Sequence, residues 1–291
     1  MTFDPLIDVD HVVTDPAYLD LEYPPEHFMT HFMSQGSVVH AYMWTAQGRD
    51  PKGCVIICPQ AFGGDRLESL IIPLLSSGIS VMTYNPRGMW DGVHEYTSIS
   101  ALDDACAAVE FLHRARLLGK TTKLGHDYRI DVDRIVCLGL SGGGGTVSLA
   151  ACAALDSVRG AVGIAPSNHE PFRNATPEDV AHETLNWVKE ETAGRVDTVP
   201  RVLAMTDADI DRTSVIHNVP KLLSKPVLLI GADRDTATPL ATCHVPIAQA
   251  FREAKAQNFT EVIMETDHLF LTKRIALARL VISWLRSECG M

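Results

Sequence analysis

The sequence contains no dense run of basic residues, and its first Lys or Arg is Arg49. The 291 residues carry 25 basic and 36 acidic side chains, which gives a formal charge of −11. Binding to a phosphate backbone needs clustered Lys and Arg, so a nucleic-acid partner is not expected. The acidic start also lacks the positive region of a secretory signal and the Arg-rich character of a transit peptide.

Membrane spans and metal-ligand motifs are also missing. No run reaches the ~18 apolar residues that a membrane span requires, and no CxxC, HxH or HExxH pattern anchors a metal site. The cysteines stand scattered at positions 54, 58, 106, 137, 152, 243 and 289. An odd number of cysteines without regular spacing is typical of reduced, buried thiols. We therefore expect a cytoplasmic protein without a metal and without a membrane partner.

The chain does contain a regular alternation of strand-like and helix-like segments. Short apolar runs predict strands at residues 54–58, 80–84, 134–138, 158–164, 227–230 and 260–264. Helical spacing lies between most of them, at residues 66–75, 99–118, 142–154, 241–254 and 271–286. This order predicts an α/β fold with a mostly parallel, doubly wound sheet. Two apolar stretches between Phe28 and Trp44 predict a β-hairpin, which adds an antiparallel N-terminal edge.

One insertion interrupts the alternation and suggests a division into parts. We predict an N-terminal arm at 1–27, a core at 28–166 and 223–291, and a small helical lid at 167–222. Thr176-Pro177-Glu178-Asp179 resembles a helix start, and that helix is expected to run to about Glu191. Ligand sites in open α/β sheets lie at the carboxyl ends of the strands, where the lid would sit. The alternative is a surface decoration that touches no pocket.

The sharpest motif is Gly139-Leu140-Ser141-Gly142-Gly143, directly after a predicted strand and before a helix of small residues. A serine in a G-x-S-x-G turn sits on a strained backbone that exposes its hydroxyl above the sheet. The following helix directs its N-terminal N–H groups at the same point. A phosphate-binding glycine loop is the alternative, but no GK[ST] follows the glycines. Ser141 is thus a candidate nucleophile.

A nucleophilic serine needs a general base, and the base needs an acid to orient it. In this arrangement the expected chain order is serine, acid, histidine. Asp233 and Asp235 both follow the predicted strand at 227–230, and we favour Asp235, with the other aspartate capping the turn. His268 follows the last predicted strand and is the expected base. His244 is its main rival.

These residues resemble the α/β-hydrolase superfamily, over about residues 28–288. Residues 55–64, ending in Gln60-Ala61-Phe62-Gly63-Gly64, stand where that family has an apolar strand and an H-G-x-x-G oxyanion loop. Tyr84-Asn85-Pro86-Arg87-Gly88 and the stretch from Gly231 to Pro239 are similar to the branch of dipeptidyl-peptidase-like and acyl-peptidase-like hydrolases. Gln60-Ala61 departs from the usual His-Gly, so the oxyanion loop could be shaped differently.

The resemblance implies acyl-transfer chemistry with Ser141, His268 and Asp235 as the triad. It implies an oxyanion hole formed by the backbone N–H groups of Phe62 and Gly142, because such donation needs no side chain. It implies neither a metal nor an organic cofactor.

The substrate is less sharply defined by the sequence. Gln60 is a candidate substrate-binding residue, and Phe172 and Trp187 of the lid would suit an apolar acyl group or ring, unless they only pack the lid. A small-molecule ester or lactone is the first choice. A peptidase or amidase, a carbon–carbon bond hydrolase, an acyltransferase and a binding protein with little turnover stay open on this fold. A homodimer is left open.

Overall fold

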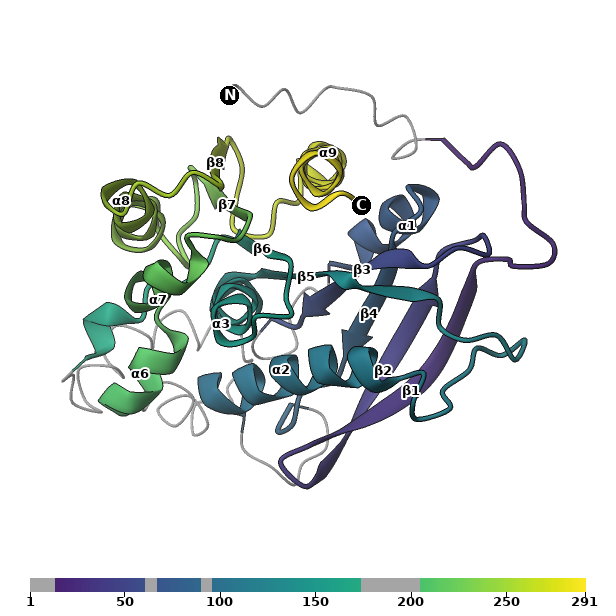
Figure 1. Ribbon diagram of the computed structural model, residues 1–291. Helices are drawn as coiled ribbons and strands as arrows, with labels where there is room; N and C mark the ends of the chain where they lie inside the picture. Colours follow the sequence, from purple (N-terminus) through teal and green to yellow (C-terminus); the bar gives the residue numbers. More distant parts are fainter. Residues whose placement is uncertain (1–13, 61–66, 90–95, 174–204) are drawn as a thin grey trace.

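A single mixed sheet organises the molecule (Figure 1). The structure is a computed structural model, and it describes residues 14–60, 67–89, 96–173 and 205–291. Its strands are β1 Glu26–Ser34, β2 Ser37–Thr45, β3 Lys52–Cys58, β4 Ser80–Tyr84, β5 Ile130–Leu140, β6 Gly160–Ile164, β7 Val227–Ala232 and β8 Phe259–Met264. They lie in the order β1-β2-β4-β3-β5-β6-β7-β8.

Pairing within the sheet follows the burial pattern of each strand. β1 and β2 pair antiparallel, and β2 pairs antiparallel with β4. All remaining pairs are parallel. Side chains of β1 alternate between exposed and buried, as expected for a sheet with one face in solvent, whereas every residue of β4, β6 and β7 is buried. The predicted mixed sheet with an antiparallel N-terminal edge is confirmed.

The turn between β1 and β2 explains why the hairpin forms where the sequence predicted it. Gln35 and Gly36 both have positive φ values, 46° and 79°. Two successive residues with positive φ give a two-residue turn whose twist matches that of the flanking strands. Glycine adopts this backbone at little cost, so Gly36 fixes the register in which Ser34 pairs with Ser37.

Helices cover both faces of the sheet (Figure 1). One face packs against α1 Glu68–Ser76 and α9 Arg274–Cys289. The other packs against α2 Ser98–Arg114, α3 Val147–Ala154, α7 Val215–Leu222 and α8 Val245–Glu253. Each face has its own apolar core, and the two cores are separated by the sheet. The doubly wound arrangement leaves the loops at the carboxyl ends of the parallel strands free to carry a site.

The predicted lid region is described in part. It contains a short 3₁₀ turn at Glu170–Phe172, α6 Asp207–Thr213 and α7. α7 packs its Val215, Val219 and Leu222 into the same core as α3 and α8. The predicted helix from Thr176 to Glu191 lies outside the described residues. The division into arm, core and lid stays a prediction. Over the described ranges, no helix combines the length and apolar character needed to cross a bilayer.

Candidate active site

Ser141 stands at the sharp turn that ends β5. Its φ is 67° and its ψ is −171°, a backbone region that is essentially restricted to glycine. Such a conformation costs about 1–3 kcal/mol, and the surrounding structure must hold it in place. A π-helical turn, Gly142–Thr146, follows at once and leads into α3. The sequence-predicted strand–turn–helix context of Ser141 is therefore present.

The glycines around Ser141 are required because backbone segments meet there. A Cβ added to Gly139 would lie 2.3 Å from the carbonyl carbon and oxygen of Gly144. A Cβ on Gly144 would lie 2.6 Å from Cys58 O, and one on Gly145 would lie 2.7 Å from Ile164 O. β5 and the turn after Ser141 can approach each other and the neighbouring strands only without side chains at these positions.

We expect Gly139→Ala to lower the free energy of unfolding by more than about 4 kcal/mol, since its new methyl group meets fixed backbone. Gly163 pairs with Gly139 in the sheet and is a matched control. A Cβ there meets the end of the Leu149 side chain, 2.5 Å away, which can move. Gly163→Ala should therefore cost only about 1–3 kcal/mol. Urea denaturation measures both, and equal losses would contradict the backbone explanation.

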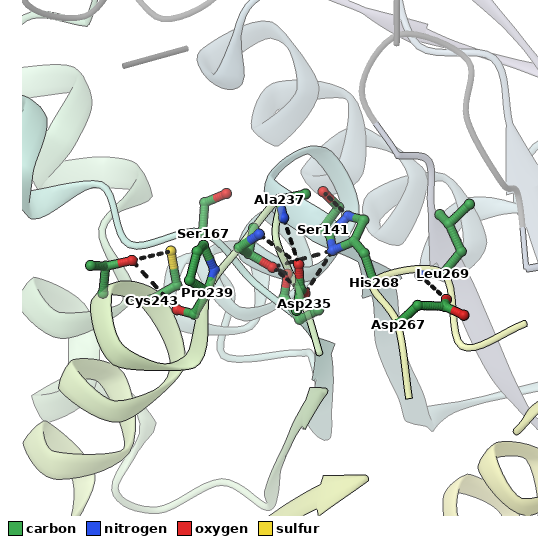
Figure 2. A network of polar contacts seen from close by, with 12 residues as sticks. Ser141, Ser167, Asp235, Ala237, Pro239, Cys243, Asp267, His268 and Leu269 are labelled. Carbon is green, nitrogen blue, oxygen red and sulfur yellow. Dashed lines mark hydrogen bonds and ion pairs between the residues drawn. The ribbon is translucent and has the colours of Figure 1, made fainter. Parts of the chain in front are cut away.

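His268 reaches Ser141 from the loop after β8. Its Nε2 lies 3.0 Å from Ser141 Oγ, and its Nδ1 lies 2.7 Å from Asp235 Oδ2 (Figure 2). The loop holds its shape through Asp267, whose Oδ1 accepts the backbone N–H of Leu269. His268 and Ser141 are 9% and 3% exposed, so little water competes for their hydrogen bond. The structure thus brings the predicted nucleophile, base and acid into one hydrogen-bonded row.

Asp235 is held as a carboxylate by several donors. Its Oδ1 accepts the backbone N–H groups of Ala237 and Thr238, each at 2.8 Å (Figure 2). Thr238 Oγ1 lies 2.7 Å from Oδ2, beside His268 Nδ1. Burial favours the neutral acid, but the hydrogen bond and charge of His268 and the two contacts from Thr238 outweigh it and lower the pKa of Asp235. A permanent negative charge therefore faces His268 Nδ1.

Asp233 and His244, the alternative acid and the alternative base, have other hydrogen-bond partners. Asp233 Oδ1 accepts the backbone N–H of Thr266 at 2.9 Å, which fastens the loop after β7 to the loop after β8. His244 Nε2 lies 3.0 Å from Glu261 Oε1, and its ring packs where a Cβ on Gly231 would be. Burial lowers the pKa of His244, although Glu261 opposes this. Geometry thus favours Asp235 and His268 in the hydrogen-bonded row.

The remaining predicted site residues are placed only in part. Gln60 is 4% exposed, and its Oε1 has no hydrogen-bond partner among the described residues. Phe172 lies in the 3₁₀ turn, with its ring 6.2 Å from that of His169. Gly142 begins the turn directly after Ser141. Phe62 and Trp187 lie outside the described residues. The binding roles of these residues, the oxyanion hole included, stay predictions.

Two buried polar groups, one in contact with Asp235 and His268 and one in the loop after β6, escaped the sequence prediction. Thr238 contacts both Asp235 and His268, at 2.7 and 3.3 Å. A threonine three residues after an aspartate often returns a hydrogen bond to it, so this signal was available in the sequence. His169, in the loop after β6, is 2% exposed and hydrogen-bonds Thr213 Oγ1 through Nδ1 at 2.9 Å. Nothing local in the sequence marks His169 as buried.

His169 should make stability depend on pH. Burial lowers its pKa to about 4 from an ordinary 6.5, so the unfolded chain binds a proton that the folded chain excludes. The free energy of unfolding should therefore fall as the pH drops from about 6.5 to about 4, and by about 2 kcal/mol between pH 7 and pH 5.

The test compares urea denaturation at pH 7 and pH 5 in wild type, His169→Gln and His31→Gln. His169→Gln should lose this contribution of about 2 kcal/mol to the pH dependence. His31 is exposed, so its replacement should leave the wild-type dependence. An unchanged pH dependence in His169→Gln would contradict the assignment.

Chemically, the row can generate a nucleophile. With the proton on His268 Nδ1, Nε2 offers a lone pair to the Ser141 hydroxyl, and Asp235 stabilises the ring when it becomes charged. Within the described residues, no three His, Cys, Asp or Glu side chains group in a way that could hold a metal ion. The contacts from Ser141 Oγ to His268 and from His268 to Asp235 thus have the geometry for proton transfer from the serine hydroxyl.

Solved structures share this architecture at low sequence identity. A puromycin-hydrolyzing peptidase of Mycobacterium tuberculosis matches with a TM-score of 0.65 and 17% identity, over 94% of this chain and 40% of its own. A Pyrococcus horikoshii acylaminoacyl peptidase matches with 0.60 and 16%, over 92% and 42%. A Pyrobaculum calidifontis esterase matches with 0.64 and 14%, over 97% and 90%.

The chain thus spans about two fifths of the length of the two peptidases and nearly all of the esterase. No protein-family model matches it, and no curated protein matches its sequence. At these identities the likeness establishes the fold, so the architecture predicted from the sequence is confirmed.

Proposed function

We propose that this chain, which has the α/β-hydrolase fold, is a serine hydrolase that cleaves a carboxylic ester or lactone. The observation that carries the proposal is the continuous row from Ser141 Oγ through His268 to Asp235 Oδ2, with links of 3.0 and 2.7 Å. A buried serine on a strained turn, in contact with an oriented imidazole, has the geometry of an activated nucleophile.

In the proposed reaction, Ser141 Oγ attacks the carbonyl carbon while its proton passes to His268 Nε2. The carbonyl π electrons move to oxygen, where the backbone N–H groups of Gly142 and Phe62 would stabilise the negative charge. The tetrahedral intermediate collapses, the bond to the leaving oxygen breaks, and His268 returns the proton to that oxygen. Water, deprotonated by the same ring, then attacks the acyl-enzyme and releases the acid and free Ser141.

An ester is the less demanding substrate for such a row, because an alcohol leaves more readily than an amine. A peptidase or amidase is the second candidate, and the likeness to two peptidases favours it. The same residues would act on an amide only if His268 also protonates the leaving nitrogen. Substrate turnover decides between the two candidates.

A fluorophosphonate probe tests the nucleophile. Such probes phosphonylate an activated serine, so folded wild-type protein should take up one label per chain, and peptide mapping should place it on Ser141. Ser141→Ala and urea-unfolded wild type should not react. Absent labelling of the folded wild type, or equal labelling of Ser141→Ala, would contradict the proposal.

A substrate panel tests the class of bond. Phenyl esters of increasing acyl length and aminoacyl anilides are supplied to wild type and to Ser141→Ala, and product release is followed. We expect the wild type to hydrolyse at least one phenyl ester. Anilide turnover with inert esters would replace the ester proposal by the peptidase.

A further inference from the structure

The loop after β6, residues 165–169, is fastened to three other segments by threonine side chains. These are Thr146 in the turn after Ser141, Thr238 in the loop that carries Asp235, and Thr213 at the end of α6. A loop fixed from three sides presents its side chains in a single geometry, which is what preorganised recognition requires.

Thr146 makes the tightest of these attachments. Its hydroxyl donates to Ser167 O at 3.0 Å, and its oxygen accepts the Ser167 backbone N–H at 2.9 Å. Both polar backbone groups of Ser167 are thereby bound by one side chain that is 0% exposed. Because Thr146 belongs to the turn that begins at Gly142, Ser167 is tied to the same segment as the proposed oxyanion donor.

The two ends of the loop are fixed as well. Ala165 has a positive φ of 44°, its backbone N–H donates to Ile230 O at 2.7 Å, and its carbonyl oxygen lies 3.0 Å from Thr238 Oγ1. At the other end, Thr213 donates its own proton to Asp209 O at 2.9 Å, so its oxygen accepts from His169 Nδ1. The His169 ring is thus held in one orientation. Neither end of the loop can shift without breaking a buried contact.

The Ser167 side chain is the part of the loop that faces Gly142. A Cβ built on Gly142 would lie 2.6 Å from Ser167 Oγ, so the hydroxyl occupies the space beside the Gly142 backbone. Ser167 is half-buried, and Figure 2 places it beside the loop that carries Asp235 and Ala237. Its Oγ forms no hydrogen bond with a described residue, although its backbone is fully bound. A hydroxyl can both donate and accept.

We propose that Ser167 determines substrate specificity by hydrogen-bonding a hydroxyl or amino group on the carbon next to the scissile carbonyl. The inference rests on the proposed hydrolase function. If the Gly142 N–H binds the carbonyl oxygen, Ser167 Oγ reaches only groups close to that carbonyl. His268 must protonate the leaving oxygen, which places the leaving group on the His268 side, and the proposal assigns Ser167 to the acyl side. The substrate class is a 2-hydroxyacyl or 2-aminoacyl compound.

The test measures kcat/KM for phenyl 2-hydroxybutanoate and phenyl 2-aminobutanoate, each relative to phenyl butanoate. Because the substituent also alters intrinsic reactivity, the readout is the change in this ratio between wild type and Ser167→Ala. We expect at least one ratio to fall about tenfold, as for the loss of one good hydrogen bond. Ser287→Ala, which removes a hydroxyl near the end of α9, should keep both wild-type ratios.

The attachment by Thr146 is tested separately. Thr146→Val removes the hydroxyl that binds Ser167, and it should lower the same ratio as Ser167→Ala, whereas Thr146→Ser retains the hydroxyl and should restore it. A structural defect alone would slow all three esters equally and leave the ratios at their wild-type values.

The outcomes separate the two proposals. If both ratios in Ser167→Ala stay within twofold of wild type while phenyl butanoate is still hydrolysed, the role of Ser167 is overturned and the hydrolase proposal stands. A Ser167-dependent preference only for a hydroxyl in the alcohol part, measured with 2-hydroxyethyl and propyl butanoate, would also overturn it. Absence of both turnover and fluorophosphonate labelling would overturn the hydrolase proposal, and the inference with it.

Discussion

Replacing Ser141 with alanine is expected to lower kcat for a phenyl ester by about 10⁶-fold, because no other group can form the acyl-enzyme. Any residual turnover should come from binding and oxyanion stabilisation, which act without the nucleophile. The measurement is steady-state phenol release, with the variant purified apart from wild type to exclude contamination. A loss of less than about a hundredfold would contradict the assignment of Ser141.

Ser141→Gly is the matched control for folding. Glycine also lacks the hydroxyl, so turnover should fall as far as in Ser141→Ala. It adopts a φ of 67° with far less strain, however, so the glycine variant should be more stable than the alanine variant. The difference in unfolding free energy should be about 1 kcal/mol or more, measured by urea denaturation. Equal stability would mean that the turn stores no strain.

Asp235→Asn is expected to lower kcat by about 10⁴-fold. The amide carries no charge, and its NH₂ group can donate to His268 Nδ1. The ring proton would then lie on Nε2. A protonated Nε2 has no lone pair with which to accept the Ser141 proton. Folding should be largely kept, because the amide oxygen can still accept the backbone N–H groups of Ala237 and Thr238. The measurement is again phenol release, with circular dichroism as the check on folding.

Asp233→Asn is the control that separates the two aspartates. Asp233 accepts the Thr266 backbone N–H and makes no hydrogen bond with His268, and an asparagine oxygen can accept the same hydrogen bond from Thr266. Most of the wild-type turnover should therefore remain. If Asp233→Asn removed activity and Asp235→Asn did not, the hydrogen-bonded row would not be the machinery of the reaction.

Local sequence patterns predicted the elements well where burial and periodicity coincide. The run at 80–84 matches β4 residue for residue, because all of its side chains are buried. The run at 134–138 fell short of β5, which begins at Ile130. Ile130 is paired with Lys52 of β3, so a neighbouring strand rather than an apolar pattern extends β5 there. The helix expected at 99–118 begins one residue earlier, capped by Thr97, and ends at Arg114.

For the candidate site as well, the sequence predicted local features but not the contacts between distant segments. The order of Ser141, an acid and His268, each after a strand, was visible in the sequence because parallel strands end at one edge of the sheet. The sequence favoured Asp235 over Asp233, but both follow β7 within the same turn, and only the 2.7 Å contact with His268 Nδ1 separates them. The contact of Ser167 with Gly142 was not visible in the sequence, because it joins the loop after β6 to the turn after β5.

The sequence by itself determined the alternation of strands and helices, the hairpin at the N-terminal edge and the turn that carries Ser141. These depend on local burial patterns and on glycines, which act over a few residues. Only the tertiary structure decided which aspartate faces His268, why Gly139 has no room for a side chain, and how three threonines hold Ser167. These depend on distances between segments far apart in the chain, to which no local pattern gives access.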